Sequence, residues 1–166
     1  MDRPCVNIEL QPMLQDYLLH EFGGKPNDTG VMINSSSDIG EMIQSMISVK
    51  DRPPKQEIKD YPFTIFLPVN DWNHYVFREN FIYIPEWKQK LLVKYIESSF
   101  RIRVREFFVA GYEKKYTQDA IINAFLSAYN IRHSKINYDA IKKYDYRNRK
   151  RTEREIRDII AANIDI

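Results

Sequence analysis

Cysteine is almost absent from this 166-residue sequence, in which Cys5 stands alone. One thiol cannot form an internal disulfide or supply the ligands of a thiolate zinc site, which fits a reducing cytoplasm. Histidine is also scarce, because His20, His74 and His133 lie far apart and none has a partner at metal-ligand spacing. The sequence therefore predicts no metal site, no small-molecule cofactor and a cytoplasmic location.

Long apolar runs are missing as well. No run reaches the roughly 18 residues that crossing a bilayer requires. Residues 1–10 lack the charged start and apolar stretch of a secretory signal. We therefore expect no membrane partner and a protein that stays in the compartment where it is made.

Complete catalytic motifs are lacking too. The run Gly23-Gly24-Lys25 has no upstream glycine at phosphate-loop distance, so it predicts a turn. Glu57 and Lys59 have the E-x-K spacing of metal-dependent nucleases, but they fall in a charged, proline-containing connection instead of a buried strand. The sequence thus predicts a protein that is not an enzyme, with a nuclease as an alternative.

Charge is plentiful but unevenly distributed. Residues 1–84 contain 7 Lys and Arg against 12 Asp and Glu, whereas residues 85–166 contain 18 against 11. A hydrophobic content of 43%, with 13% aromatic residues, is enough to fill a core. We predict an acidic α+β subdomain over 1–84 and a basic, all-helical subdomain over 85–166, packed as one compact unit. The basic end is expected to bind a polyanion.

The first half has the pattern of a β-α-β-α layer followed by a hairpin. Apolar periodicity changes between the spacing of strands and that of helices, and turn residues separate the segments. Asp38 and Glu41 have the spacing of a capping box. The expected elements are strands at 6–10 and 31–33, helices starting at Pro12 and Asp38, and a β-hairpin formed by 63–69 and 75–84 around Asn70, Asp71 and Asn73.

The second half has the pattern of a helical bundle. A four-residue apolar spacing predicts a helix from Pro85 to near Gly111, although the stretch 100–105 also alternates like a strand. Three further helices are expected, with starts at Thr117, Asn137 and Thr152. The last of them is expected to pack Ile156, Ile159 and Ile160 against the core. The predicted fold class is therefore α+β.

The most basic segment lies in the second of these three helices and the start of the last. Residues 142–157 contain eight Lys and Arg against three Asp and Glu. A helix, a brief polar connection and a basic helix together resemble a helix-turn-helix unit. The residues that carry the resemblance are Phe125 and Tyr129, then Asn130 and Ile131 in the turn, then Ile136 and Ile141 as inward anchors.

The resemblance implies a set of DNA contacts. Tyr138, Lys142, Lys143, Tyr146 and Arg147 would face the major groove, and Arg149, Lys150 and Arg151 would neutralise flanking phosphates. The chain departs from the pattern at Leu126, where such units have a small residue, and at Asp139, where they have an apolar one. The alternative is a solvated basic helix whose charges pair locally.

Three short runs also resemble small proteins encoded by bacterial phages and integrative elements. They are Ile-Glu-Leu-Gln-Pro at 8–12, Phe-Leu-Ser-Ala-Tyr-Asn-Ile at 125–131 and Ile-Lys-Lys-Tyr-Asp-Tyr-Arg-Asn-Arg at 141–149. This resemblance implies a setting and no activity. Two hypotheses follow: a DNA-binding protein with double-stranded DNA as partner, or an assembly protein of a virion, in which the acidic and basic ends of successive copies, or of another phage protein, build a ring or collar.

Overall fold

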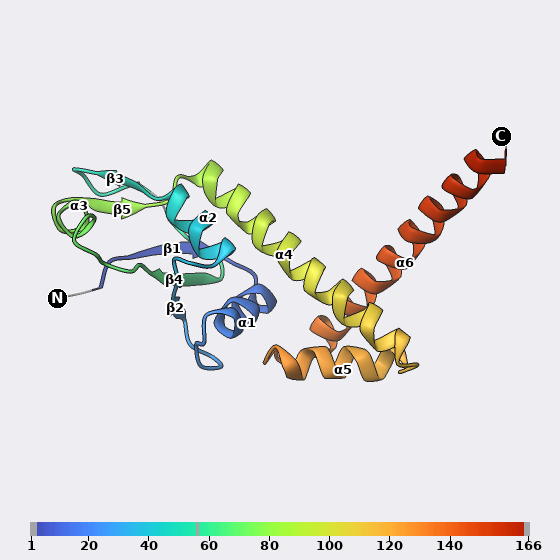
Figure 1. The fold of residues 1–166 in the computed structure, drawn as a ribbon. Coiled ribbons are helices and arrows are strands. Elements are labelled where there is room, and N and C mark those ends of the chain that lie inside the picture. Colours follow the sequence, from blue (N-terminus) through green and yellow to red (C-terminus); the bar gives the residue numbers. More distant parts are fainter. Residues whose placement is uncertain (1–2, 56, 165–166) are drawn as a thin grey trace. The chain divides into compact units, whose positions relative to one another are not determined.

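The computed structural model describes residues 3–55 and 57–164 (Figure 1). Contacts divide the chain into two compact units, Met1–Ser99 and Phe100–Ile166. The first unit contains 10 Lys and Arg against 14 Asp and Glu, and the second contains 15 against 9. The two units therefore differ in the sign of their net charge, −4 against +6. The predicted α+β class is confirmed.

The first unit is built on a three-stranded sheet with β4 (Pro62–Phe66) in the centre. The strand β1 (Cys5–Glu9) pairs with β4 antiparallel, and β2 (Gly30–Met32) pairs with it parallel. Ile65 lies opposite Val6 on one side and Val31 on the other, and all three are buried. Side chains alternate along β1, so this sheet has one apolar face directed into the core.

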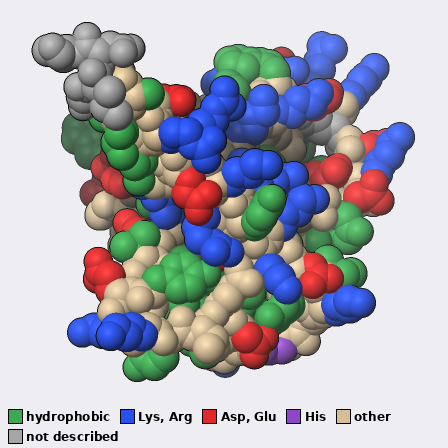
Figure 2. All heavy atoms as spheres, turned by 90° about the vertical axis from the view of Figure 1, so that its right-hand side faces the viewer, with side chains coloured by type: hydrophobic (Ala, Val, Ile, Leu, Met, Phe, Trp, Pro, Cys, Tyr) green, Lys and Arg blue, Asp and Glu red, His purple; other side chains and the backbone are tan. Residues whose placement is uncertain are grey.

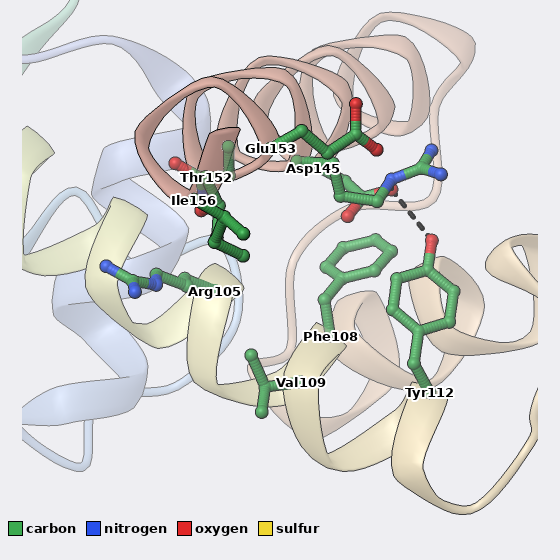
Figure 3. A pocket seen from close by; sticks show the side chains of 10 residues that line it. Arg105, Phe108, Val109, Tyr112, Asp145, Thr152, Glu153 and Ile156 are labelled. Carbon is green, nitrogen blue, oxygen red and sulfur yellow. Dashed lines mark hydrogen bonds and ion pairs between the residues drawn. The ribbon is translucent and has the colours of Figure 1, made fainter. Parts of the chain in front are cut away.

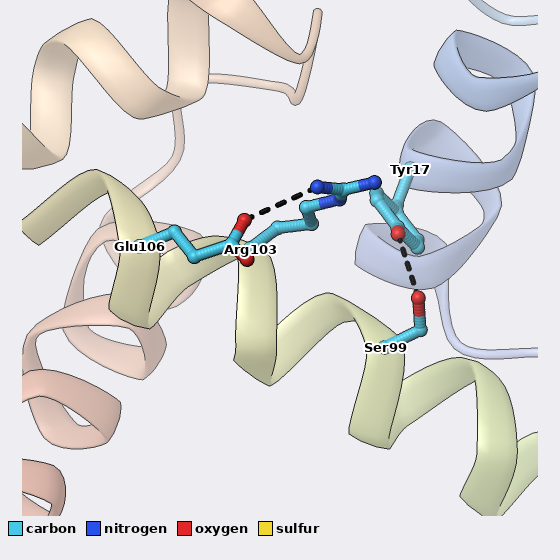
Figure 4. Close-up of polar contacts among 4 residues, drawn as sticks. All are labelled: Tyr17, Ser99, Arg103 and Glu106. Atoms are coloured by element: carbon cyan, nitrogen blue, oxygen red, sulfur yellow. Dashed lines mark hydrogen bonds and ion pairs between the residues drawn. The ribbon is translucent and has the colours of Figure 1, made fainter.

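Two helices, together with the buried side chains of Leu92 and Ile96, complete the core of this unit. The helix α1 (Pro12–Glu21) begins at a proline, as predicted, and buries Leu14, Tyr17 and Leu18. The Tyr17 hydroxyl is hydrogen-bonded to Ser99 Oγ at 3.1 Å (Figure 4). The helix α2 (Asp38–Met46) is capped one residue earlier than predicted, because Ser37 Oγ accepts the Gly40 N–H at 3.0 Å.

The predicted hairpin over 63–84 is wrong. Residues 74–79 form a short helix, α3 (His74–Glu79), and the strand that follows, β5 (Phe81–Tyr83), pairs antiparallel with β3 (Ser48–Lys50). The turn explains the helix, because Asn70 Oδ1 accepts the N–H groups of Trp72 and Asn73 at 3.0 Å and directs the chain into it. The strand β4 is already paired on both edges with distant parts of the chain.

The second unit is helical. The helix α4 (Glu86–Glu113) runs through the ambiguous stretch 100–105, as predicted, and ends two residues after Gly111. Its side chains in this unit include buried Phe100, Val104 and Phe108, spaced one turn apart. The helix α5 (Gln118–Ala128) starts after Thr117, whose Oγ1 accepts the Ala120 N–H at 3.3 Å, as predicted.

The last helix, α6 (Lys135–Ile164), is continuous over 30 residues. The predicted start at Thr152 is wrong, since Thr152 lies within an uninterrupted helix and has no end to cap. The predicted Asn137 cap is also wrong, because Ser134 Oγ accepts the Asn137 N–H at 3.1 Å. Within the described residues, no helix combines the length and the apolar character needed to cross a bilayer.

Four apolar assignments on α6 also fail. Ile136, predicted as an inward anchor, is 81% exposed, because the buried side of α6 starts at Asn137 and continues at Ile141. Ile156, Ile159 and Ile160, predicted to face the core, are 51%, 60% and 53% exposed. The spacing of these isoleucines indicated the correct side of the helix, but the described residues of the second unit cover that side only over the first half of α6.

Candidate nucleic-acid interface

Local contacts fix the connection between α5 and α6 at both of its ends. Asn130 closes α5 with a left-handed backbone, φ 53°, and Ile131 is buried immediately after it. The Asn137 side chain donates a hydrogen bond to the Arg132 carbonyl at 2.8 Å. The short polar connection expected of a helix-turn-helix unit is therefore present at 129–134, and α5 packs against α6.

Aromatic rings fix the helices of the second unit against one another. Phe125 contacts Phe100, Phe107 and Tyr129, with ring centroids 5.6, 5.5 and 4.6 Å apart. Phe100 also contacts Tyr144 of α6 at 6.1 Å, edge to face. Because Tyr144 and Ile141 face this cluster, the residues half a turn away from them face solvent.

A buried carboxylate joins the three helices of this unit, and Figure 3 shows its contact with Tyr112 of α4. Asp145 of α6 is 2% exposed, and its Oδ2 accepts hydrogen bonds from the Tyr112 hydroxyl at 2.8 Å and from Gln118 Nε2 at 2.6 Å. Arg149 Nε lies 3.2 Å from the same oxygen, so the buried charge is neutralised. Asp145 therefore fixes the rotation of α6 about its own axis relative to α4.

Because of this cluster, we expect the free energy of unfolding to change with pH in the alkaline range. Burial raises the pKa of Tyr112 above its ordinary value, and the hydrogen bond to Asp145 raises that pKa further. A raised folded-state pKa gives a contribution that is complete below about pH 10 and lost as the pH rises through the folded value. Urea denaturation is therefore expected to show a difference in unfolding free energy between wild type and Tyr112→Phe that is constant at neutral pH and smaller above about pH 10.

The control for this prediction is Tyr116→Phe, because Tyr116 is 61% exposed. Its difference from wild type is expected to be near zero at neutral pH. A Tyr112→Phe difference that stays constant to about pH 11 contradicts the assignment.

The outward side of α6 carries a row of cations. Lys143, Arg147, Lys150 and Arg154 recur at intervals of four, three and four residues, so they share one side of the helix, and all four are exposed. None of them forms an ion pair with any residue that the structure describes. We call these four residues the cationic face. Figure 2 shows one face of the molecule, where Lys and Arg side chains gather in the upper part with Asp and Glu side chains between them.

The structure brings three of the residues expected from sequence onto the cationic face: Lys143, Arg147 and Lys150. Lys142 and Tyr146 are exposed along its edge, and Lys150 Nζ lies 6.0 Å from the centre of the Tyr146 ring. Their positions allow a single surface to contact all five side chains.

Three other expected residues already have partners within the unit. The Tyr138 hydroxyl donates a hydrogen bond to Asp119 Oδ1 of α5 at 2.5 Å, which raises the Tyr138 pKa. Arg149 neutralises Asp145, as described above. Arg151 Nε lies 3.6 Å from Glu155 Oε1, with both side chains about 60% exposed, so this pair can exchange for another partner.

Sequence reasoning missed Arg154 as a member of the cationic face. The sequence predicted a separate helix starting at Thr152. In a separate helix, Arg154 would not share a side with Lys143, Arg147 and Lys150. The four-residue step from Lys150 to Arg154 was the available signal.

The remaining candidate sites are less organised. Glu57 lies in the connection between β3 and β4 and lines a depression of about 570 Å³ together with Glu9, Glu86 and Lys90. No group of His, Cys, Asp and Glu in the described part of the chain is arranged to hold a metal ion.

Comparison of the chain with protein-family models, with curated proteins and with solved structures found no match.

Proposed function

We propose that this protein binds duplex DNA through the cationic face of α6 without catalysing a reaction. The observation that carries the proposal is the row of four exposed cations, Lys143, Arg147, Lys150 and Arg154, for which the described structure offers no carboxylate partner. Exposed cations on one side of a rigid helix repel one another, and a polyanion relieves that repulsion. The phage or mobile-element setting that we propose depends on the three sequence runs alone.

The dimensions of the helix fit this role. From Lys143 to Arg154 the face extends about 16 Å, at about 1.5 Å per residue. B-DNA presents one phosphate charge per about 1.7 Å of axis, so several phosphates lie within reach of four cations. An α-helix of about 10–12 Å diameter also fits the major groove, where Lys142 and Tyr146 at the edge of the face would approach the bases.

A titration at graded salt tests the proposal. Fluorescence anisotropy with a labelled duplex of about 25 base pairs measures the association constant at each salt concentration. The logarithm of this constant is expected to fall linearly with the logarithm of the salt concentration, with a slope of about −3 to −4 for four neutralised phosphates. Absence of binding at about 50 mM salt contradicts the proposal, because the electrostatic contribution is largest there.

A second candidate function is assembly into a ring or collar. One observation favours it: the segment 69–81 of the first unit exposes large apolar side chains. Val69 is 54% exposed, Trp72 91%, Tyr75 65% and Phe81 47%, and no residue of α3 is buried. Exposed aromatic residues of this kind anchor protein–protein interfaces.

The turn that carries Trp72 is preorganised. Asn70 Oδ1 accepts the Trp72 N–H, Asn73 Oδ1 accepts the Asn70 N–H at 2.9 Å, and Asn73 Nδ2 donates to the Pro68 carbonyl at 3.1 Å. A contact made there would therefore cost little ordering of the backbone. The opposite net charges of the two units would favour contact between unlike units of successive copies.

Sedimentation velocity distinguishes the two functions. Assembly predicts large discrete species without nucleic acid that disappear in the variant Trp72→Ser/Tyr75→Ser, with Tyr116→Ser as the control in the other unit. DNA binding predicts a species no larger than a dimer without nucleic acid, which sediments faster when duplex is added. Large species that persist in the double variant contradict the aromatic contact.

A further inference from the structure

The C-terminal half of α6 presents an apolar surface that the described residues of the second unit leave exposed. Ile156, Ile159 and Ile160 continue the side of the helix that is buried at Ile141 and Asp145, yet each is more than half exposed. We call these three residues the isoleucine stripe. The pattern of the helix therefore indicates coverage over its whole length, whereas the second unit covers only its first half.

An uncovered helix of this composition is poorly stabilised alone. Isoleucine loses side-chain freedom in a helix and contributes little unless it packs. Short helical segments in water gain most of their stability from packing of an apolar side. Three isoleucines on one side differ from the isolated Ile136 on the opposite side of the same helix, since single exposed apolar residues are common on protein surfaces.

The stripe is continuous with a recess in the same unit. A cavity of about 230 Å³ lies between α4 and α6, with Phe108, Val109, Thr152 and Ile156 in its lining (Figure 3). Val109 is itself 52% exposed. Ile156 belongs to both features, so an apolar partner that covers the stripe also reaches the mouth of the cavity.

We propose that the isoleucine stripe pairs with the stripe of a second copy of this chain. The charges beside the stripe select this partner, because Arg151, Arg154 and Arg157 are balanced by Glu153, Glu155 and Asp158. A surface with both signs in equal number can meet its own copy without net repulsion. The same balance disfavours a polyanion or an anionic membrane at this site.

The order of the charges fits an antiparallel pair. When two copies of α6 cross antiparallel about Glu155, Glu153 lies level with Arg157 of the second copy, and Arg151 lies within one residue of its Asp158. In each pair the two residues lie on the same side of the stripe, which is the side that meets itself in antiparallel packing.

The same register brings the apolar side chains together. The two Ile156 side chains lie near the two-fold axis, and Ile159 of the second copy lies within one residue of the level of Thr152, at the mouth of the cavity. Such a contact involves about three helical turns per copy, well below the roughly 800 Å² per partner of a standard interface. A dimer with a dissociation constant in the micromolar range is therefore expected. The pairing does not depend on DNA binding.

Sedimentation equilibrium without nucleic acid tests the proposal. Wild type is expected to dimerise between about 1 and 200 µM. The variant Ile156→Glu/Ile159→Glu is expected to remain monomeric, and the control Ile136→Glu to dimerise like wild type. Circular dichroism checks that all three keep their helix content. A monomeric wild type at about 200 µM, or a double glutamate variant that dimerises normally, overturns the proposal.

A charge exchange tests the register. Glu153→Arg places two arginines opposite each other at each end of the antiparallel pair, and it is expected to weaken the dimer at least tenfold. Adding Arg157→Glu restores opposite charges across the pair and is expected to restore most of that affinity. If the double exchange does not recover dimerisation, the antiparallel register is wrong.

Discussion

The variant Lys143→Ala/Arg147→Ala/Lys150→Ala is expected to bind duplex DNA a few hundred-fold more weakly than wild type at about 0.1 M salt. Each phosphate contact contributes about 0.9 to the slope of log affinity against log salt, so losing three lowers the slope by about 2.7. The three side chains are exposed and have no carboxylate partner in the described structure, so their removal leaves no buried charge. Alanine also favours the helix, so the fold is expected to persist.

The matched control is Lys25→Ala/Lys55→Ala/Lys59→Ala. It removes the same charge from three exposed positions of the acidic unit. Anisotropy titrations at several salt concentrations are expected to give a nearly wild-type slope for this control. Equal losses in both variants would mean that net charge, and not the cationic face, governs binding.

Asp145→Ala is expected to lower the free energy of unfolding by about 3 kcal/mol, the largest stability effect that we predict. Asp145 is 2% exposed and accepts hydrogen bonds from Tyr112 and Gln118 while it pairs with Arg149. Its removal leaves these donors facing one another without an acceptor, and an unpaired donor costs more than its hydrogen bond contributed.

Urea denaturation followed by circular dichroism measures the loss. Asp158→Ala serves as the control, because Asp158 is an exposed carboxylate on the same helix and has no ion pair within the described residues. Its effect is expected to stay within about 0.5 kcal/mol. A loss below about 1 kcal/mol for Asp145→Ala would show that the carboxylate does not hold the helices together.

Local patterns predicted the helices well because helix formation depends on neighbours three and four residues apart. The apolar spacing of Phe100, Val104 and Phe108 indicated a helix through a stretch that also alternates like a strand, and the structure has a helix there. The capping residues were predicted less accurately. Ser37 and Ser134 cap the helices for which Asp38 and Asn137 were expected. Several small polar residues stand near each helix start, and only the backbone path decides which one accepts the N–H.

Strand pairing was not predictable in the same way. Residues 63–84 have the composition of a hairpin, but β4 pairs with β1 and β2, and β5 pairs with β3. These partners lie far away in sequence, and no periodicity within 63–84 encodes them. The helical α3 follows from the hydrogen bonds of Asn70, which a strand-based interpretation of Tyr75 and Val76 overlooked.

The candidate interface was likewise predictable only in part. Sequence alone established the abundance of cations over 142–157 and predicted that Lys143 and Arg147 face the same way, but it grouped Lys150 with the flanking residues Arg149 and Arg151. The sequence did not reveal the hydrogen bond from Tyr138 to Asp119 or the ion pair between Arg149 and Asp145. These contacts depend on how α4, α5 and α6 pack.

The sequence by itself determined the contrast in charge between the two halves, the near absence of cysteine and the positions of most helices, because composition and short-range periodicity are properties of the chain alone. Only the tertiary structure decided which strands pair, which cations on α6 have no ion-pair partner among the described residues and where the second unit leaves the isoleucine stripe exposed. These features depend on contacts between segments distant in sequence, and such contacts form only when the packed core has set the distance and rotation of each element.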